Sequence, residues 1–86
     1  MKLHVSSHLH HLTGGRSTLD VKGDSVDGVL VDLDRQFPGI RFRIVDEQDR
    51  IRPHLNIFVN ANRVKSVHAK VAPEDEVHVL AALSGG

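Results

Sequence analysis

The feature that most constrains the fold of this 86-residue chain is a single apolar stripe at helical spacing. Ser25 is typical of a helix N-cap, and Pro38-Gly39 ends a helix because proline cannot continue one. Between them, apolar residues recur at intervals of three and four, which places them on one face of a helix. The stripe consists of Val26, Val29, Leu30, Leu33 and Phe37. One amphipathic helix must bury this stripe, and the face of a β-sheet is its natural partner.

Short alternating segments before and after the helix predict the strands of that sheet. Residues 2–6 and 18–22 alternate polar and apolar, and the loop between them contains Gly14-Gly15, so they indicate a hairpin. After the helix, residues 56–60 and 76–83 predict two longer strands.

The connections are less regular. Ala61-Asn62 is interpreted as a turn because Asn tolerates left-handed geometry, and Arg63-Val64 begins a short return strand. Residues 40–55 are interpreted as mostly loop, although the alternation of Ile40, Phe42 and Ile44 is also compatible with a short strand.

This order of elements predicts a single α+β domain spanning residues 1–86. The first strand and the strand after the helix lie far apart in sequence, so we expect a mixed sheet of four or five strands packed on one main helix. That arrangement is the β-grasp, or ubiquitin-like, fold.

Composition excludes several classes of function. The chain has no cysteine, which rules out a thiolate nucleophile, a disulfide and an iron–sulfur cluster. Its 11 basic and 11 acidic residues cancel and it has only three aromatic residues, so nucleic-acid binding is not expected. No apolar run approaches the roughly 20 residues of a membrane span, and no signal peptide is recognisable. We therefore expect a soluble, cytoplasmic protein that contacts no membrane.

The last predicted strand carries apolar residues on both of its faces. Val77, Val79 and Ala81 fit the core side, whereas Leu80 and Ala82 point the other way. Leu83 and Ser84 then lead into Gly85-Gly86, which predicts a flexible C-terminal tail. Glycine lacks a Cβ, and the last three residues extended would reach about 10 Å, far enough to enter a narrow channel in another protein.

Motifs along the whole chain carry a resemblance to a known family. They are Thr13-Gly14-Gly15, Gly23-Asp24-Ser25, Phe37-Pro38-Gly39, Asn56-Ile57-Phe58-Val59-Asn60, Pro73-Glu74-Asp75-Glu76-Val77 and Ala82-Leu83-Ser84-Gly85-Gly86. On these residues the sequence resembles the sulfur-carrier proteins of the MoaD/ThiS family. Within that family it is similar to carriers that supply sulfur for cysteine synthesis, although Leu83-Ser84 stands where an Ala-rich pair is usual.

The resemblance implies that the chain is a carrier and not an enzyme. An E1-like enzyme would adenylate the Gly86 carboxylate with ATP, and sulfur would displace AMP to leave a thiocarboxylate, with Gly85 supplying flexibility. The carrier itself would bind no cofactor, since the activating partner consumes the ATP. The acceptor would be a PLP-dependent enzyme similar to cysteine synthase, or one in a related pathway.

Three alternatives remain open. The chain could be the small subunit of molybdopterin synthase, in a stable complex with the large subunit. It could be a ubiquitin-like modifier conjugated to lysines through Gly86, or a binding module with an incidental tail.

Phe58, Leu80 and Ala82 are candidates for a partner-binding patch beside the tail, with Leu83 and Ser84 continuing it. Phe58 alternates with the inward-facing Ile57 and Val59 and so faces outward, where it either anchors a partner or is partly buried by a loop.

The N-terminal segment is rich in histidine, with His4, His8, His10 and His11. Their spacing matches no zinc motif and no neighbouring acid or cysteine completes a site, so we assign no metal and expect a solvated loop. His54, His68 and His78 are interpreted as surface residues.

Overall fold

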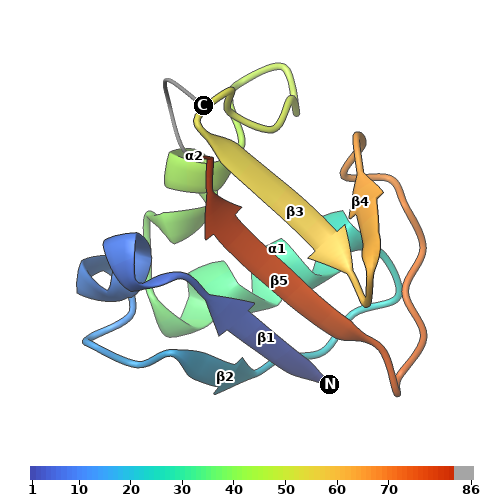
Figure 1. Ribbon diagram of the computed structural model, residues 1–86, viewed down its shortest axis with the longest axis horizontal. Helices are drawn as coiled ribbons and strands as arrows, with labels where there is room; N and C mark the ends of the chain where they lie inside the picture. Colours follow the sequence, from blue (N-terminus) through green and yellow to red (C-terminus); the bar gives the residue numbers. More distant parts are fainter. Residues whose placement is uncertain (83–86) are drawn as a thin grey trace.

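The computed structural model describes residues 1–82, and the predicted tail residues Leu83, Ser84, Gly85 and Gly86 lie outside the described part (Figure 1). Within residues 1–82, no helix is both long enough and apolar enough to cross a membrane.

A mixed five-stranded sheet forms one layer of the described chain, as predicted (Figure 1). The strands are β1 (Lys2–Val5), β2 (Thr18–Asp20), β3 (Leu55–Val59), β4 (Asn62–Val64) and β5 (Glu76–Ala81). Their order across the sheet is β2-β1-β5-β3-β4. β1 and β5 are parallel, whereas the other neighbours are antiparallel. The first and last strands of the chain, β1 and β5, are therefore neighbours within the sheet.

The main helix, α1 (Val26–Gln36), begins and ends where the sequence predicts. The Ser25 hydroxyl accepts a hydrogen bond from the Gly28 N–H at 3.0 Å, which satisfies one of the free donors of the first turn. Val26, Val29, Leu30 and Leu33 are buried, and Phe37 is half-buried just beyond the last turn.

The free amides at the start of α1 also bind the long connection between β4 and β5. The Val26 N–H donates to the Ala69 carbonyl at 2.9 Å, and the Asp27 N–H donates to the Val67 carbonyl at 2.8 Å. Val67 is fully buried, so this connection closes one end of the core.

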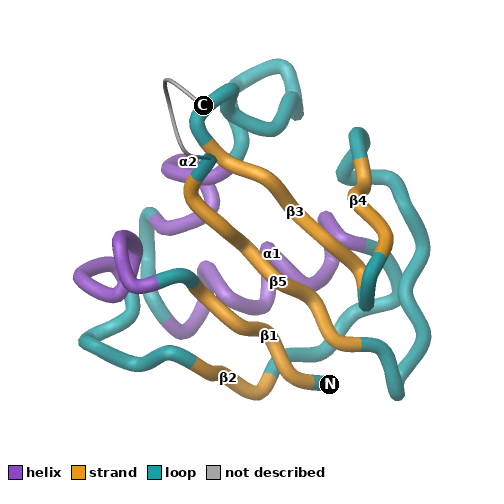
Figure 2. The backbone as a smooth tube through the Cα atoms, in the orientation of Figure 1, coloured by secondary structure: helices purple, strands orange, loops and turns teal. Residues whose placement is uncertain are grey.

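The core lies between α1 and the face of the sheet that α1 covers (Figure 2). From the sheet it includes the inward-facing residues Leu3, Val5, Leu19, Leu55, Ile57, Val59, Val77 and Val79. These residues alternate along their strands with exposed or half-buried ones, as the period-2 pattern predicts. The arrangement is the β-grasp fold.

The structure corrects the interpretation of residues 40–55. Ile40–Ile44 forms a short helix, α2, rather than loop or strand. Ile40 and Ile44 are buried on one side of this turn, while Phe42 is 57% exposed on the other. The Asp34 carboxylate accepts hydrogen bonds from the Gly39 and Arg41 amides, each at 3.0 Å, and so holds the start of α2.

The hairpin between β1 and β2 contains an additional element. Ser7–Leu12 forms a 3-10 helix, η1, that buries Leu9 against the core, where we expected only a polar loop. Gly14 and Gly15 then turn the chain with φ of +62° and +85°, conformations that favour glycine.

The turn before β4 is shifted from its predicted position. Asn60, with φ of +55°, is the left-handed residue, whereas Asn62 already belongs to β4. The Asn60 side chain accepts from the Glu76 N–H at 3.0 Å and donates to the Asp75 carboxylate at 2.9 Å, which ties this turn to the start of β5.

Candidate docking face

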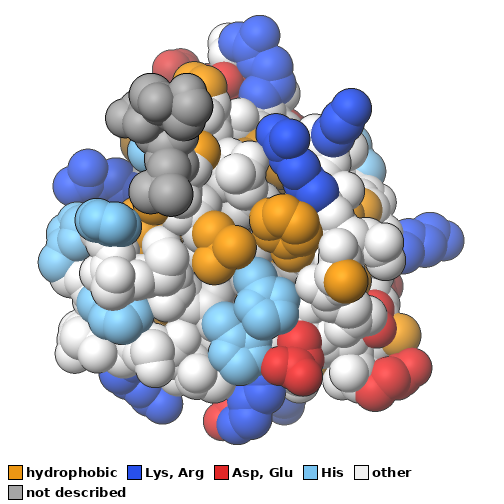
Figure 3. All heavy atoms as spheres, viewed as in Figure 1, with side chains coloured by type: hydrophobic (Ala, Val, Ile, Leu, Met, Phe, Trp, Pro, Cys, Tyr) orange, Lys and Arg blue, Asp and Glu red, His pale blue; other side chains and the backbone are white. Residues whose placement is uncertain are grey.

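The face of the sheet turned away from α1 is the candidate site, and we call it the outer face. It is made of the residues that alternate with the core positions: Lys2, His4, Thr18, Asp20, Asn56, Phe58, Arg63, Glu76, His78 and Leu80. Figure 3 shows apolar side chains near the middle of this face, with histidines beside them and acidic side chains beyond.

Phe58 and Leu80 lie together on the outer face, as the strand pattern predicts. Phe58 is paired with His78 across β3 and β5, and Leu80 is two residues further along β5. This diagonal relationship brings Cβ atoms to within about 7–8 Å, which is within reach of an aromatic side chain. Both residues are half-buried. A partner can therefore cover them without disturbing the core.

The end of β5 is held firmly before the tail begins. The Ala81 N–H donates to the Ser6 hydroxyl at 3.0 Å, and the Ala82 N–H donates to the His54 carbonyl at 2.8 Å. The backbone of Ala82, one residue beyond β5, is thus fixed by its bond to His54. The predicted roles of Leu83, Ser84, Gly85 and Gly86 concern residues outside the described part.

A shallow hollow of about 550 Å³ lies next to the end of β5. Its apolar lining comes from four residues, Leu9, Leu12, Phe42 and Ala81. Three histidines and two arginines line the remainder: His8, His11, His54, Arg43 and Arg52. The Arg52 guanidinium lies 4.7 Å from the centre of the Phe42 ring, a cation–π contact that holds both side chains.

Charged residues at the β1–β2 edge of the outer face are paired. The Lys2 ammonium lies 2.7 Å from the Asp20 carboxylate and holds the pKa of Asp20 below its ordinary value. Because both side chains are largely exposed, this pair contributes little to stability.

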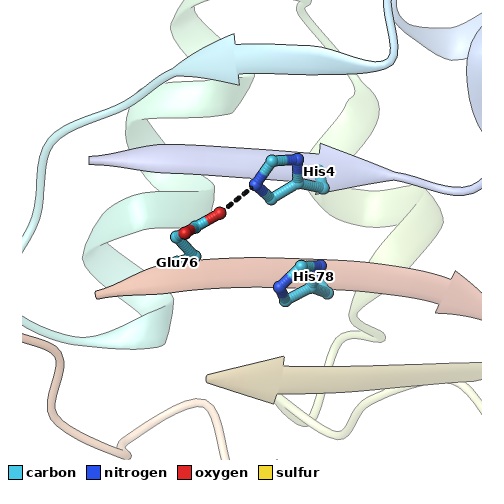
Figure 4. A group of neighbouring side chains, drawn as sticks. All are labelled: His4, Glu76 and His78. Atoms are coloured by element: carbon cyan, nitrogen blue, oxygen red, sulfur yellow. Dashed lines mark hydrogen bonds and ion pairs between the residues drawn. The ribbon is translucent and has the colours of Figure 1, made fainter. Parts of the chain in front are cut away.

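Three polar side chains from distant parts of the sequence meet on the outer face. His4 on β1 is paired with His78 on β5, and Glu76 lies two residues before His78 on the same side of its strand (Figure 4). The Nε2 atom of His4 lies 2.5 Å from the Glu76 carboxylate. The imidazole rings of His4 and His78 are stacked with centroids 4.7 Å apart. Only the parallel pairing of β1 with β5 places these residues together, and no local spacing in the sequence signals it.

Comparison with known proteins identifies the family. A sequence model described as the ThiS family matches residues 3–86, which is nearly the whole chain and includes the last residue. The chain belongs to the ThiS family. The curated proteins similar to this chain include the sulfur carrier protein CysO of Mycobacterium bovis and that of Mycobacterium tuberculosis. Each is 32% identical over 79 residues, covering 86% of this chain and 85% of the relative.

Solved structures agree with this assignment. The chain is similar to a structure of the Amycolatopsis orientalis BexX/CysO complex, with a TM-score of 0.90 and 27% identity over 99% of this chain and 98% of that one. Mycobacterium tuberculosis CysO matches with a TM-score of 0.88 and 26% identity over 95% and 98% of the two chains. Small archaeal modifier protein 1 from Methanosarcina acetivorans matches with a TM-score of 0.80 over 99% and 94%, and at 23% identity it shows the fold alone. The predicted family and β-grasp fold are thus confirmed.

Proposed function

We propose that this ThiS-family chain is a sulfur carrier whose Gly86 carboxylate is the group that partner enzymes act upon. The observation that supports the proposal most strongly is the family match over residues 3–86, a range that includes Gly85 and Gly86. Similarity to proteins named sulfur carrier protein CysO supports the same role, with cysteine synthesis or a related pathway as its destination.

The chemistry has two steps at one carbon atom. An E1-like enzyme transfers AMP from ATP to the Gly86 carboxylate and releases pyrophosphate, which converts a poor electrophile into one with a good leaving group. Hydrosulfide, HS⁻, then attacks the carbonyl carbon, AMP departs, the proton is lost to solvent, and a thiocarboxylate remains. Its sulfur is a better nucleophile than the carboxylate oxygen, for the same reason that the thiolate is the reactive form of a cysteine side chain. The carrier supplies the tail and the docking surface, and its partners catalyse the reactions.

The outer face fits the role of a docking surface. Phe58 and Leu80 are half-buried apolar residues of this face, and we expect Ala82, one residue beyond β5, to continue the apolar patch toward the tail. A related structure was solved as a complex of CysO with BexX, which supports a protein partner for this fold. We expect the activating enzyme to bind this patch, so that the tail enters its active site.

Adenylation is the direct test of this proposal. With a cognate E1-like enzyme, the chain should support ATP–pyrophosphate exchange, and a variant lacking Gly86 should not. Exchange that persists without Gly86 would show that another group is activated.

The choice of acceptor is tested by capture of the thiocarboxylate form. Retention of a PLP-dependent synthase favours the carrier role, and retention of a molybdopterin synthase large subunit favours the subunit role. A modifier would instead form high-mass conjugates that disappear when Gly86 is deleted.

A further inference from the structure

Two imidazoles and one carboxylate lie together on the outer face, on the first and last strands of the chain. The ligand-capable atoms of His4, Glu76 and His78 all lie within 4.8 Å of one another. All three side chains project from adjacent central strands, and Figure 4 shows them grouped on one side of the sheet. The backbone of a central strand pair is rigid, so the sheet keeps these donors together without help from a loop.

The hydrogen bonds of His4 are compatible with a metal ion at this position. Its Nδ1 atom lies 3.3 Å from the Thr18 hydroxyl, and its Nε2 atom faces the Glu76 carboxylate. When Nδ1 carries the proton and donates to Thr18, Nε2 and the carboxylate present lone pairs to each other. In this tautomer both atoms can bind one metal ion, whereas in the other tautomer Nε2 donates to Glu76 and Nδ1 accepts from Thr18. Metal-ligating histidines are held in the same way, with the second ring nitrogen bonded to a neighbouring group.

The two histidine rings lie face to face within the cluster. They are inclined by only 15°, and their centroids are 4.7 Å apart. The neighbouring charged groups, Lys2 and Asp20, are paired with each other. The cluster therefore offers two imidazoles and one carboxylate that can bind a single ion.

We propose that His4, Glu76 and His78 form a binding site for a divalent transition metal such as Zn²⁺. Two imidazoles and a carboxylate are a ligand set found in zinc proteins, where water or another donor takes the fourth position. Bonds of about 2.1 Å in a tetrahedral arrangement separate the ligand atoms by about 3.4 Å, within the present spread of this cluster. A metal lies in the plane of each imidazole that binds it, so one of the parallel rings must turn about its Cβ–Cγ bond. The His78 side chain is only half-buried, which leaves room for this rotation while His4 keeps its contact with Thr18.

The fourth position of the metal faces away from α1, beside Phe58 and Leu80. A donor from a docked protein could occupy it, and this consequence rests on the proposed docking role of the outer face. Binding of the metal by the free chain does not depend on that docking role. A failure of the metal-site proposal can therefore be distinguished from a failure of the proposed function.

Calorimetric titration of the full-length chain with Zn²⁺ at neutral pH tests the site. We expect one ion to bind, with Glu76→Gln and His78→Gln each weakening the affinity at least about tenfold. His11→Gln and His68→Gln are matched controls, because they remove exposed histidines outside the cluster, and they should leave the affinity unchanged. Far-UV circular dichroism verifies folding, and Glu76 is sufficiently exposed for its substitution to be tolerated.

NMR of the histidine rings gives an answer that needs no variant. Zn²⁺ should shift the ring resonances of His4 and His78 first. The proposal is overturned if the chain binds no Zn²⁺, if the cluster variants bind it as tightly as the native chain, or if the ring resonances of His8, His10 and His11 shift instead.

Discussion

Phe58 on β3 is paired directly with His78 on β5, on the face of the sheet that turns away from α1. Its two sequence neighbours, Ile57 and Val59, are buried in the core. Phe58 is thus fixed by rigid strands while its ring remains partly accessible, which is the arrangement expected of an aromatic anchor.

Replacing Phe58 with Asp should weaken docking to the activating enzyme and leave the fold intact. A central aromatic anchor contributes about 2 kcal/mol or more, so we expect at least about a tenfold loss in ATP–pyrophosphate exchange at limiting carrier concentration. The melting temperature should change little, because the ring does not face α1.

Val31→Asp is the matched control for this variant. Val31 is 47% exposed on α1, on the other side of the molecule, and its substitution should leave exchange unchanged. A Phe58→Asp variant that unfolds would assign Phe58 to the core instead.

Gly23→Ala should destabilise the chain. A Cβ at this position would lie 2.6 Å from the Val29 amide nitrogen and 2.8 Å from the Gly28 carbonyl carbon, and neither backbone atom can move without displacing α1. Overpacking of this kind costs about 1–3 kcal/mol, measurable by urea denaturation.

Gly28→Ala provides the opposite control within the same region. The nearest atom to its added Cβ is the Ser25 hydroxyl at 3.4 Å, and alanine in a helix is favoured over glycine by about 0.5–1 kcal/mol. Equal destabilisation by both substitutions would contradict the close packing of Gly23 against α1.

Ser25→Ala should remove the N-cap of α1. The hydrogen bond from the Gly28 N–H would be lost, at a cost of about 0.5–2 kcal/mol in the free energy of unfolding. Ser25→Asp keeps an acceptor at the same place and should retain most of the stability. If alanine and aspartate behave alike in denaturant titrations, the cap contributes nothing.

Asp46 should make stability depend on pH in the acid range. The Arg50 and Gln48 amides both donate to its carboxylate at 2.9 Å, and these hydrogen bonds, that from Arg50 foremost, lower the pKa of Asp46 below its ordinary 3.8. A lowered pKa means that the folded state prefers the charged form. Its contribution is complete above the ordinary pKa and is lost as the pH falls through the folded value.

Melting temperatures of Asp46→Asn and the native chain should therefore differ most near neutral pH and converge below about pH 4. The exposed neighbour Glu47 provides a control through Glu47→Gln. A difference for Asp46→Asn that is constant from neutral to acid pH would contradict this account.

Local patterns in the sequence predicted α1 but not α2. The stripe from Val26 to Leu33 is long enough for its period to exclude a strand, and the Ser25 cap fixes where it begins. For α2 the period is ambiguous, since Ile40 and Ile44 fit one face of a helix turn as well as one face of a strand. The Gly39 and Arg41 amides donate to the Asp34 carboxylate across the break at Pro38-Gly39, and neither the helical period nor the strand period signals these bonds.

Local patterns predicted one feature of the outer face and missed another. The outward direction of Phe58 and Leu80 follows from alternation along single strands, and it was predicted. The meeting of His4 with Glu76 and His78 depends on the order and register of strands more than 70 residues apart, because β1 and β5 pair only in the folded sheet.

Intact mass spectrometry of the full-length chain tests the central claim most directly. After incubation with ATP, a cognate E1-like enzyme and a sulfide source, the account predicts a protein in which one oxygen atom is replaced by sulfur. A chain lacking Gly86, or one extended by a residue after it, should keep its original mass while melting at nearly the same temperature as the native chain. If the native chain's mass stays unchanged with several competent E1-like enzymes, Gly86 is not a sulfur-carrying terminus and the account is wrong.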